Sequence, residues 1–254
     1  MNLKVVLYEK RDGVAVLTMN YPERLNALSD QLRADLRAAF EEALNDREVR
    51  ALILTGTGRA FCAGADISGF KFDIPSIRKF MRDVMPFLGM LEKYPKPVIA
   101  AVNGLALGGG FELAISCDII VASDKARFGV PEAAIGLVPA FAILRLHQIV
   151  GRAKSKELGM TCDQISAEEG LQIGLINKVV PHENLMDASM EMANKILSKA
   201  PLAVELIKLA VNRHLHGEEF DYAVEALSSL FQSKDAQEGM DAFLNKRKPV
   251  FKGL

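Results

Sequence analysis

Residues 96–118 read KPVIAAVNGLALGGGFELAISCD, in which an apolar run, three glycines and a second apolar run follow one another. This pattern predicts a buried strand over residues 98–102, a loop over residues 103–110 and a helix that begins at the glycines. A single carboxylate in that helix, Glu112, stands among Phe, Leu, Ala and Ile residues. Burying a carboxylate without a partner is costly. We therefore expect Glu112 to be paired or to serve a chemical purpose.

The apolar stretch around this segment, residues 97–123, is long enough in principle to cross a bilayer. It also contains Asn103, Glu112 and Asp118 together with four glycines, and charges in the middle of a bilayer are expensive. A buried strand, a glycine turn and a buried helix explain the stretch better than a membrane span.

The same plan occurs one step earlier in the chain. Residues 51–55 (ALILT) predict a buried parallel strand that Gly56 ends, and a glycine-containing loop follows over residues 56–66. Strand, glycine loop and helix therefore occur twice in succession, and this alternation indicates an α/β fold. Other expected elements are strands at residues 5–9, 14–19, 119–122 and 176–180, helices after the N-cap Ser29 and at residues 77–93 and 166–171, and mainly helix beyond residue 183.

Composition narrows the class of protein. The 254 residues can bury a sizeable core. They include 31 Lys and Arg against 32 Asp and Glu, so a nucleic-acid partner is not expected. The scattered Cys62, Cys117 and Cys162 form no CxxC motif, which predicts reduced thiols. The first residues, MNLKVVLYEKRDG, lack the apolar core of a signal peptide. We expect a cytoplasmic protein without a membrane anchor.

Several common site motifs are absent from the sequence. Neither glycine loop completes the dinucleotide-binding pattern G-x-G-x-x-G, because Phe61 and Leu113 stand where the third glycine is needed. No P-loop or nucleophile elbow occurs. His214 and His216 lack the neighbouring ligands of a metal site, so no metal is expected.

Two carboxylates and two glycine loops remain as candidates. Unpaired N–H groups at a glycine turn that opens a helix attract negative charge, although such glycines can also serve only close packing. Glu112 and Glu132 each follow a predicted buried strand, and an apolar setting should raise the pKa of such a carboxyl. Acid and base groups beside oxyanion-stabilising amides suit proton transfer next to a thioester carbonyl.

Residues 56–67 (GTGRAFCAGADI) and residues 96–118 closely resemble the two signature segments of the enoyl-CoA hydratase/isomerase (crotonase) family. The resemblance extends over essentially the whole chain. It implies an α/β fold, the crotonase (ClpP-like) spiral of ββα units with a C-terminal helical region. Further segments that agree with the family are residues 22–28 (PERLNAL), 128–132 (FGVPE), 174–181 (GLINKVVP) and 238–243 (EGMDAF).

The resemblance also implies roles. The N–H groups of Ala65 and Gly109 would form the oxyanion hole, Glu112 would activate water toward Cβ, and Glu132 would supply the proton at Cα. The reaction is the reversible hydration of a 2-enoyl-CoA to a 3-hydroxyacyl-CoA. Coenzyme A is part of the substrate, so no separate cofactor is expected. Substrate contacts are expected from Ala63, Gly64, Asp66, Ile67, Gly108, Ala140 and Phe141.

The resemblance further predicts the organisation of the chain and its assembly. It places the spiral core in residues 1–195 and a helical region in residues 196–254 that serves trimerisation and covers the active site. The expected assembly is a homotrimer or a homohexamer. The basic run of residues 246–248 is typical of a solvated surface.

One segment departs from the family pattern. Hydratases carry a glycine-rich turn of the type P-G-A-G-G-T-Q-R-L after the second glutamate, whereas residues 139–146 read PAFAILRL, one residue shorter and without glycine. Phe141 and Ile143 make these surroundings bulkier and more apolar. The sequence therefore does not specify the acyl group of the substrate, which can be cyclic or otherwise unusual. Alternative functions are another crotonase reaction (double-bond isomerisation, decarboxylation or C–C hydrolysis) and an inert acyl-CoA-binding or RNA-binding scaffold. Because Glu112 and Glu132 are both present, hydration is favoured.

Overall fold

The computed structural model describes residues 2–66, 73–212, 224–225, 228 and 231–250, and a six-stranded sheet lies at its centre. Its first two strands are antiparallel, and every other neighbouring pair is parallel. The strands predicted around the glycine loops are therefore confirmed as neighbours in one parallel sheet. In sheet order the strands are β1 (Val6–Arg11), β2 (Val14–Met19), β3 (Ala51–Gly56), β5 (Val98–Val102), β7 (Ile119–Ser123) and β10 (Lys178–Val180).

A second sheet, of four short strands, was not visible in the sequence. Residues 103–110, predicted to be a loop, contain one of its strands, so that prediction was wrong in part. Strands of two or three residues are too short to show a hydrophobic period, and only pairing with distant segments defines them. In sheet order these strands are β4 (Ala60–Cys62), β6 (Leu105–Leu107), β8 (Arg127–Gly129) and β9 (Ile165–Ser166).

Each strand–glycine loop–helix repeat is therefore a ββα unit. The strand of the central sheet is followed by a strand of the small sheet and then by a helix, as in β5, β6 and α3 (Gly109–Ile115). Parallel pairing of β4 with β6 and of β6 with β8 stacks successive units beside one another. The two glycine loops, which lie at these small strands, are thereby brought together.

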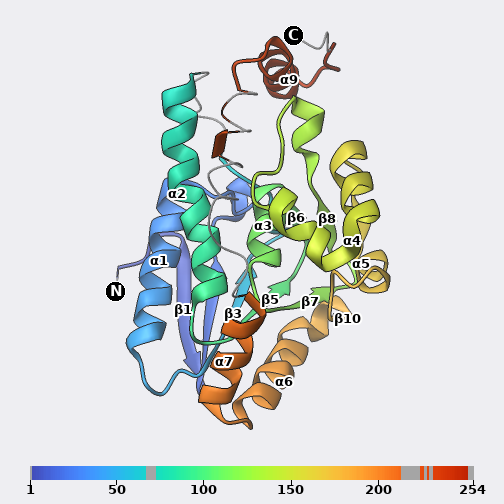
Figure 1. The fold of residues 1–254 in the computed structure, drawn as a ribbon. Helices are drawn as coiled ribbons and strands as arrows, with labels where there is room; N and C mark the ends of the chain where they lie inside the picture. Colours follow the sequence, from blue (N-terminus) through green and yellow to red (C-terminus); the bar gives the residue numbers. More distant parts are fainter. Residues whose placement is uncertain (1, 67–72, 213–223, 226–227, 229–230, 251–254) are drawn as a thin grey trace.

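Helices cover both faces of the central sheet (Figure 1). Alternate strand residues such as Leu17 and Leu54 share one core with the helices from α1 to α4, whereas Ile53 and Ala101 pack under α6. Ser29 caps α1 as predicted, since its hydroxyl accepts a hydrogen bond from the Leu32 N–H. Besides α3, the structure describes the α-helices α1 (Asp30–Asn45), α2 (Ile74–Lys93), α4 (Ala142–Thr161), α5 (Ala167–Gln172), α6 (Leu185–Leu197), α7 (Pro201–Asn212) and α9 (Lys234–Leu244).

The helices α7 and α9 lie at opposite ends of the molecule, with α9 beside the C-terminus (Figure 1). The assignment of residues 196–254 to trimerisation and active-site cover stays a prediction. Within the described residues, none of the helices combines the length and the apolar character needed to cross a bilayer.

A buried ion pair anchors α7 to the rest of the fold. Lys208 is 8% exposed, and its Nζ lies 2.7 Å from the Asp118 carboxylate and 3.2 Å from the Lys96 carbonyl. The Asp118 carboxylate also accepts a hydrogen bond from the Val98 N–H, at the start of β5. Lys208 therefore ties α7 to the sheet edge where α3 ends and β7 begins.

We predict that Lys208→Met lowers the free energy of unfolding by about 3 kcal/mol, because the substitution leaves the buried Asp118 carboxylate without its cation. Urea denaturation at pH 7 measures the change. The matched control is Lys195→Met, whose ammonium pairs with Glu191 on the exposed surface of α6 and contributes less than about 1 kcal/mol. Equal stability of the two variants would contradict the anchoring role of Lys208.

Candidate active site

The first site loop is held in place by the segment PERLNAL. Leu25 and Asn26 adopt positive φ angles of 52° and 53°, which turns the chain sharply before Leu28. Asn26 is fully buried, and its side-chain amide donates hydrogen bonds to the Thr57 carbonyl (3.0 Å) and the Ala60 carbonyl (2.8 Å). This asparagine therefore connects an N-terminal turn to the glycine loop that follows β3.

Two main-chain hydrogen bonds then fix the end of that loop. The Ala63 N–H donates to the Leu25 carbonyl at 3.0 Å, and the Leu28 N–H donates to the Gly64 carbonyl at 2.8 Å. With its own carbonyl engaged, Gly64 holds the following residue, Ala65, in a set position beside the second glycine loop.

The two glycine loops meet at Ala65 and Gly109. A β-carbon built on Gly109 would lie 3.5 Å from the Ala65 nitrogen, so the two backbones are in close contact. A β-carbon on Gly110 would lie 1.9 Å from the Cys62 carbonyl oxygen, which no side chain could occupy. Neither the Ala65 N–H nor the Gly109 N–H donates a hydrogen bond within the part of the chain that the structure describes. Two unpaired amides therefore stand next to each other.

Gly108 lies in close contact with the second carboxylate, that of Glu132. Its φ of +53° favours glycine, and an added β-carbon would lie 2.9 Å from Oε1 of Glu132. The Gly108 N–H donates to the Gly129 carbonyl at 2.9 Å, which joins the loop to the end of β8. Glu132 follows three residues later, on the short 3-10 helix η2 (Pro131–Ile135).

Glu112 is buried and hydrogen-bonded. It lies in the first turn of α3 with 6% of its surface exposed. One carboxylate oxygen accepts hydrogen bonds from the Phe141 N–H (2.7 Å) and the Ala142 N–H (2.9 Å). Burial raises the pKa of Glu112 above its ordinary value, and the Ala142 and Phe141 N–H donors offset only part of this rise. The donors favour the ionised form of this carboxyl.

Glu132 has a different environment. Its side chain is half-buried, and Oε2 is buried without a hydrogen-bond partner among the described residues. Burial, and then the negative charge of Glu112, raise the pKa of Glu132 to about 8. Glu132 therefore keeps a proton at neutral pH. Of the two carboxyl groups, Glu112 is the one whose ionised form is stabilised by two N–H donors.

The glycine-free turn after Pro139 supplies the donors to Glu112. Phe141 is fully buried, and the guanidinium of Arg145 lies over its ring at 5.4 Å. Arg145 forms a buried ion pair with Glu92 of α2 at 2.7 Å. Ala140 and Phe141 are among the residues predicted from the sequence, whereas Ala142, Arg145 and Glu92 are not. The sequence feature that could have identified Glu92 and Arg145 is the presence of two opposite charges in otherwise apolar helical stretches.

The structure brings most of the predicted site residues together. Ala65, Gly108, Gly109, Glu112 and Glu132 form the centre of the site. Ala63, Gly64 and Asp66 lie on the first glycine loop, and Ala140 and Phe141 line the turn beside Glu112, whereas Ile67 lies outside the described residues.

Known proteins of similar sequence and structure match this chain over its full length. The profile of the family described as Enoyl-CoA hydratase/isomerase matches residues 9–254. A short-chain-enoyl-CoA hydratase of Clostridium acetobutylicum is 45% identical, over 98% of this chain and 97% of the relative. A crotonyl-CoA hydratase of Syntrophomonas wolfei is 40% identical, over 97% of each chain. The solved structure of a methylmalonyl-CoA decarboxylase in complex with 2-nitronate-propionyl-CoA is 33% identical, with a TM-score of 0.89 and full coverage of both chains.

We predict that Glu132→Gln becomes increasingly stabilising as the pH rises from 5 to 9. The folded protein holds the Glu132 proton up to about pH 8, whereas the unfolded chain releases it near pH 4.5. Wild-type stability therefore falls across this interval, and the neutral glutamine removes that loss. We expect the difference in unfolding free energy between Glu132→Gln and the wild type to grow by at least about 1.4 kcal/mol, which is the free energy equivalent of a pKa difference of one between the folded and unfolded states.

Denaturation curves at several pH values measure this difference. The control is Glu168→Gln, which makes the same substitution on the exposed surface of α5. If the difference in unfolding free energy between Glu132→Gln and the wild type did not change with pH, the pKa of Glu132 would not be raised by folding.

Proposed function

The chain belongs to the enoyl-CoA hydratase/isomerase family, and we propose that it catalyses the reversible hydration of a 2-enoyl-CoA to a 3-hydroxyacyl-CoA. The observation that carries the proposal is a pair of carboxyl groups beside two unpaired amides: Glu112 accepts two N–H hydrogen bonds, and Glu132 has a buried oxygen without a donor among the described residues. Relatives named as short-chain and crotonyl-CoA hydratases support the same reaction. The spiral of ββα units is the fold of the family.

The two amides would stabilise the transition state. The thioester oxygen accepts hydrogen bonds from the Ala65 and Gly109 N–H groups, which polarises the conjugated double bond and stabilises the enolate. These donors are fixed by backbone packing before substrate binds, so they need no reorganisation during the reaction. One such donor is typically worth about 100-fold to 1000-fold in rate.

The two carboxyl groups would move the protons. Glu112, ionised and held by the Phe141 and Ala142 N–H groups, takes a proton from the water that attacks Cβ. Glu132, protonated at neutral pH, gives its proton to Cα. In dehydration the same groups act in the opposite order. Neither step needs a metal or a resident cofactor, and coenzyme A enters only as part of the substrate.

Substrate contacts follow from the placement of the loops. Ala63, Gly64 and Asp66 would border the coenzyme A portion, and Gly108 would leave room for the thioester. Ala140 and the buried Phe141 would border the acyl group with an apolar wall. This wall favours an acyl chain without charge near Cβ.

We propose that the active protein is a homotrimer or a homohexamer in the cytoplasm. All three cysteines are free thiols, in keeping with a reducing compartment. A helix that is apolar on nearly every side is usually buried, yet α7 exposes several large apolar side chains. These side chains are Leu202 (72% exposed), Leu206 (64%), Ile207 (65%) and Val211 (73%).

We predict that Glu112→Gln and Glu132→Gln each lower kcat for hydration of crotonyl-CoA by about 100-fold to 10,000-fold, because each removes one proton-transfer group. Loss of the absorbance of the conjugated enoyl thioester measures the reaction. Glu168→Gln serves as the control with unchanged activity. The proposal is abandoned if wild-type protein does not consume the conjugated thioester, or if mass analysis shows a decarboxylated or isomerised product instead.

We predict that Leu206→Glu reduces the assembly to smaller species, because a charge on the apolar face of α7 is incompatible with burial against a second copy. Light scattering coupled to size-exclusion chromatography measures the mass against the 27.8 kDa of one chain. The control is Leu171→Glu on α5, another exposed leucine (44%). A wild-type mass of one chain would overturn the proposed assembly.

A further inference from the structure

The helix α9 packs directly against the backbone of the turn that carries Glu132. A β-carbon built on Gly239 would lie 2.6 Å from the carbonyl carbon and oxygen of Ile135. A β-carbon built on Gly136 would lie 2.7 Å from the Cα of Ala236. Two glycines therefore permit a backbone-to-backbone contact that no larger residue could keep. The EGMDAF segment, to which the proposed reaction assigns no role, contains one of them.

The contacted turn is short and internally bonded. The Leu137 N–H donates to the carbonyl of Glu132 at 2.9 Å, and the Gly136 N–H donates to the Ala133 carbonyl at 3.1 Å. Ile135 is thus enclosed by hydrogen bonds that begin at Glu132 itself. We therefore expect a displacement of Ile135 to move the backbone of Glu132 as well.

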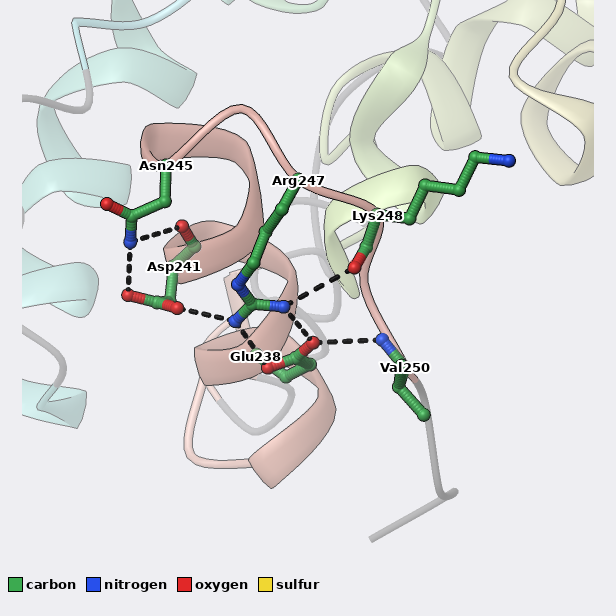
Figure 2. Close-up of polar contacts among 6 residues, drawn as sticks. All are labelled: Glu238, Asp241, Asn245, Arg247, Lys248 and Val250. Carbon is green, nitrogen blue, oxygen red and sulfur yellow. Dashed lines mark hydrogen bonds and ion pairs between the residues drawn. The ribbon is translucent and has the colours of Figure 1, made fainter.

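The helix that presses on the turn is itself held at both ends. Ser233 caps its start by accepting a hydrogen bond from the Ala236 N–H at 3.0 Å. At its other end, Arg247 donates to both carboxylate oxygens of Glu238, at 2.6 and 2.8 Å, and the Val250 N–H donates to the same carboxylate (Figure 2). The chain after α9 is thereby folded back onto the helix.

We propose that Gly239 is a positioning residue for catalysis, through which α9 sets the place of the Glu132 carboxyl relative to Glu112 and the two amides. This inference rests on the proposed function. Gly239 touches no substrate: it acts by allowing α9 to come within van der Waals contact of Ile135. The C-terminal helix is then part of the catalytic geometry.

The test is Gly239→Ala, which adds one methyl group where the neighbouring backbone leaves no room. Ordinary contact requires about 3.4 Å or more against the 2.6 Å available, so helix or turn must move by most of an ångström. A misplacement of about 1 Å can cost about 100-fold in rate. We expect kcat for crotonyl-CoA hydration to fall about 10-fold to 100-fold. KM should change little, because the coenzyme A contacts lie on the first glycine loop.

The matched control is Gly159→Ala in α4. It makes the same substitution inside a helix, but a β-carbon there meets no atom within 4 Å. It should leave kcat and KM unchanged. Any general effect of alanine on helix stability is present in both variants, so only the contact with Ile135 distinguishes them.

Hydrogen–deuterium exchange supplies a readout that does not depend on activity. In Gly239→Ala the amides of Gly136 and Leu137 should exchange faster than in wild type or Gly159→Ala, because their hydrogen bonds lie within the displaced turn. Should Gly239→Ala fail to fold, Arg247→Gln loosens α9 without adding atoms. We expect it to lower kcat by up to about fivefold, with partial rescue by Arg247→Lys.

Two results would overturn the inference. One is a wild-type enzyme that hydrates crotonyl-CoA and depends on Glu132, together with a Gly239→Ala variant that matches Gly159→Ala in kcat. The other is unchanged exchange at Gly136 and Leu137 in a folded Gly239→Ala protein. Failure of the proposed function can be distinguished from these results, because the wild-type protein would then not hydrate crotonyl-CoA. Hydrogen–deuterium exchange at Gly136 and Leu137 would still test the contact between Gly239 and Ile135.

Discussion

The structure depends on the contact between two glycine loops, in which main chain packs against main chain. A β-carbon at Gly110 would lie 1.9 Å from the Cys62 carbonyl oxygen, and one at Gly109 would lie 3.5 Å from the Ala65 nitrogen. This packing places the Ala65 and Gly109 amides side by side. Because the donors are backbone groups, their positions follow from the fold and not from side-chain rotamers. The electrophilic part of the site is therefore rigid before substrate arrives.

Two carboxyl groups of the same chemical type acquire different behaviour from their surroundings. Glu112 accepts two main-chain hydrogen bonds, which favour its charged form and offset part of the rise in pKa that burial causes. Glu132 has a buried oxygen without a donor among the described residues and feels the charge of Glu112, so its pKa rises to about 8. Unequal hydrogen bonding thus gives the two carboxyl groups different environments, as the proposed division into an acid and a base requires. The residues that make the difference, Phe141 and Ala142, contribute only their amides.

A glycine at a close contact between two backbones occurs at two places in the structure. Within the spiral it joins the loops that carry Ala65 and Gly109. At the C-terminal end it seats α9 on the turn of Glu132 through Gly239. Close packing of this kind transmits small displacements instead of absorbing them. This is why a helix at one end of the molecule (Figure 1) can matter for a carboxyl group that it does not touch.

The sequence by itself determined the elements that local signals encode and the residues whose chemistry is conspicuous. The buried strands at residues 51–55 and 98–102, the Ser29 cap, and the acidic residues Glu112 and Glu132 in apolar runs could all be predicted, because hydrophobic period and residue type are local properties. Only the tertiary structure decided which groups meet. The donors to Glu112 lie 29 and 30 residues away, the short strands of the second sheet exist only through pairing, and α7 and α9 separate to opposite ends. Contacts between distant segments depend on how whole layers pack, which no short stretch of sequence specifies.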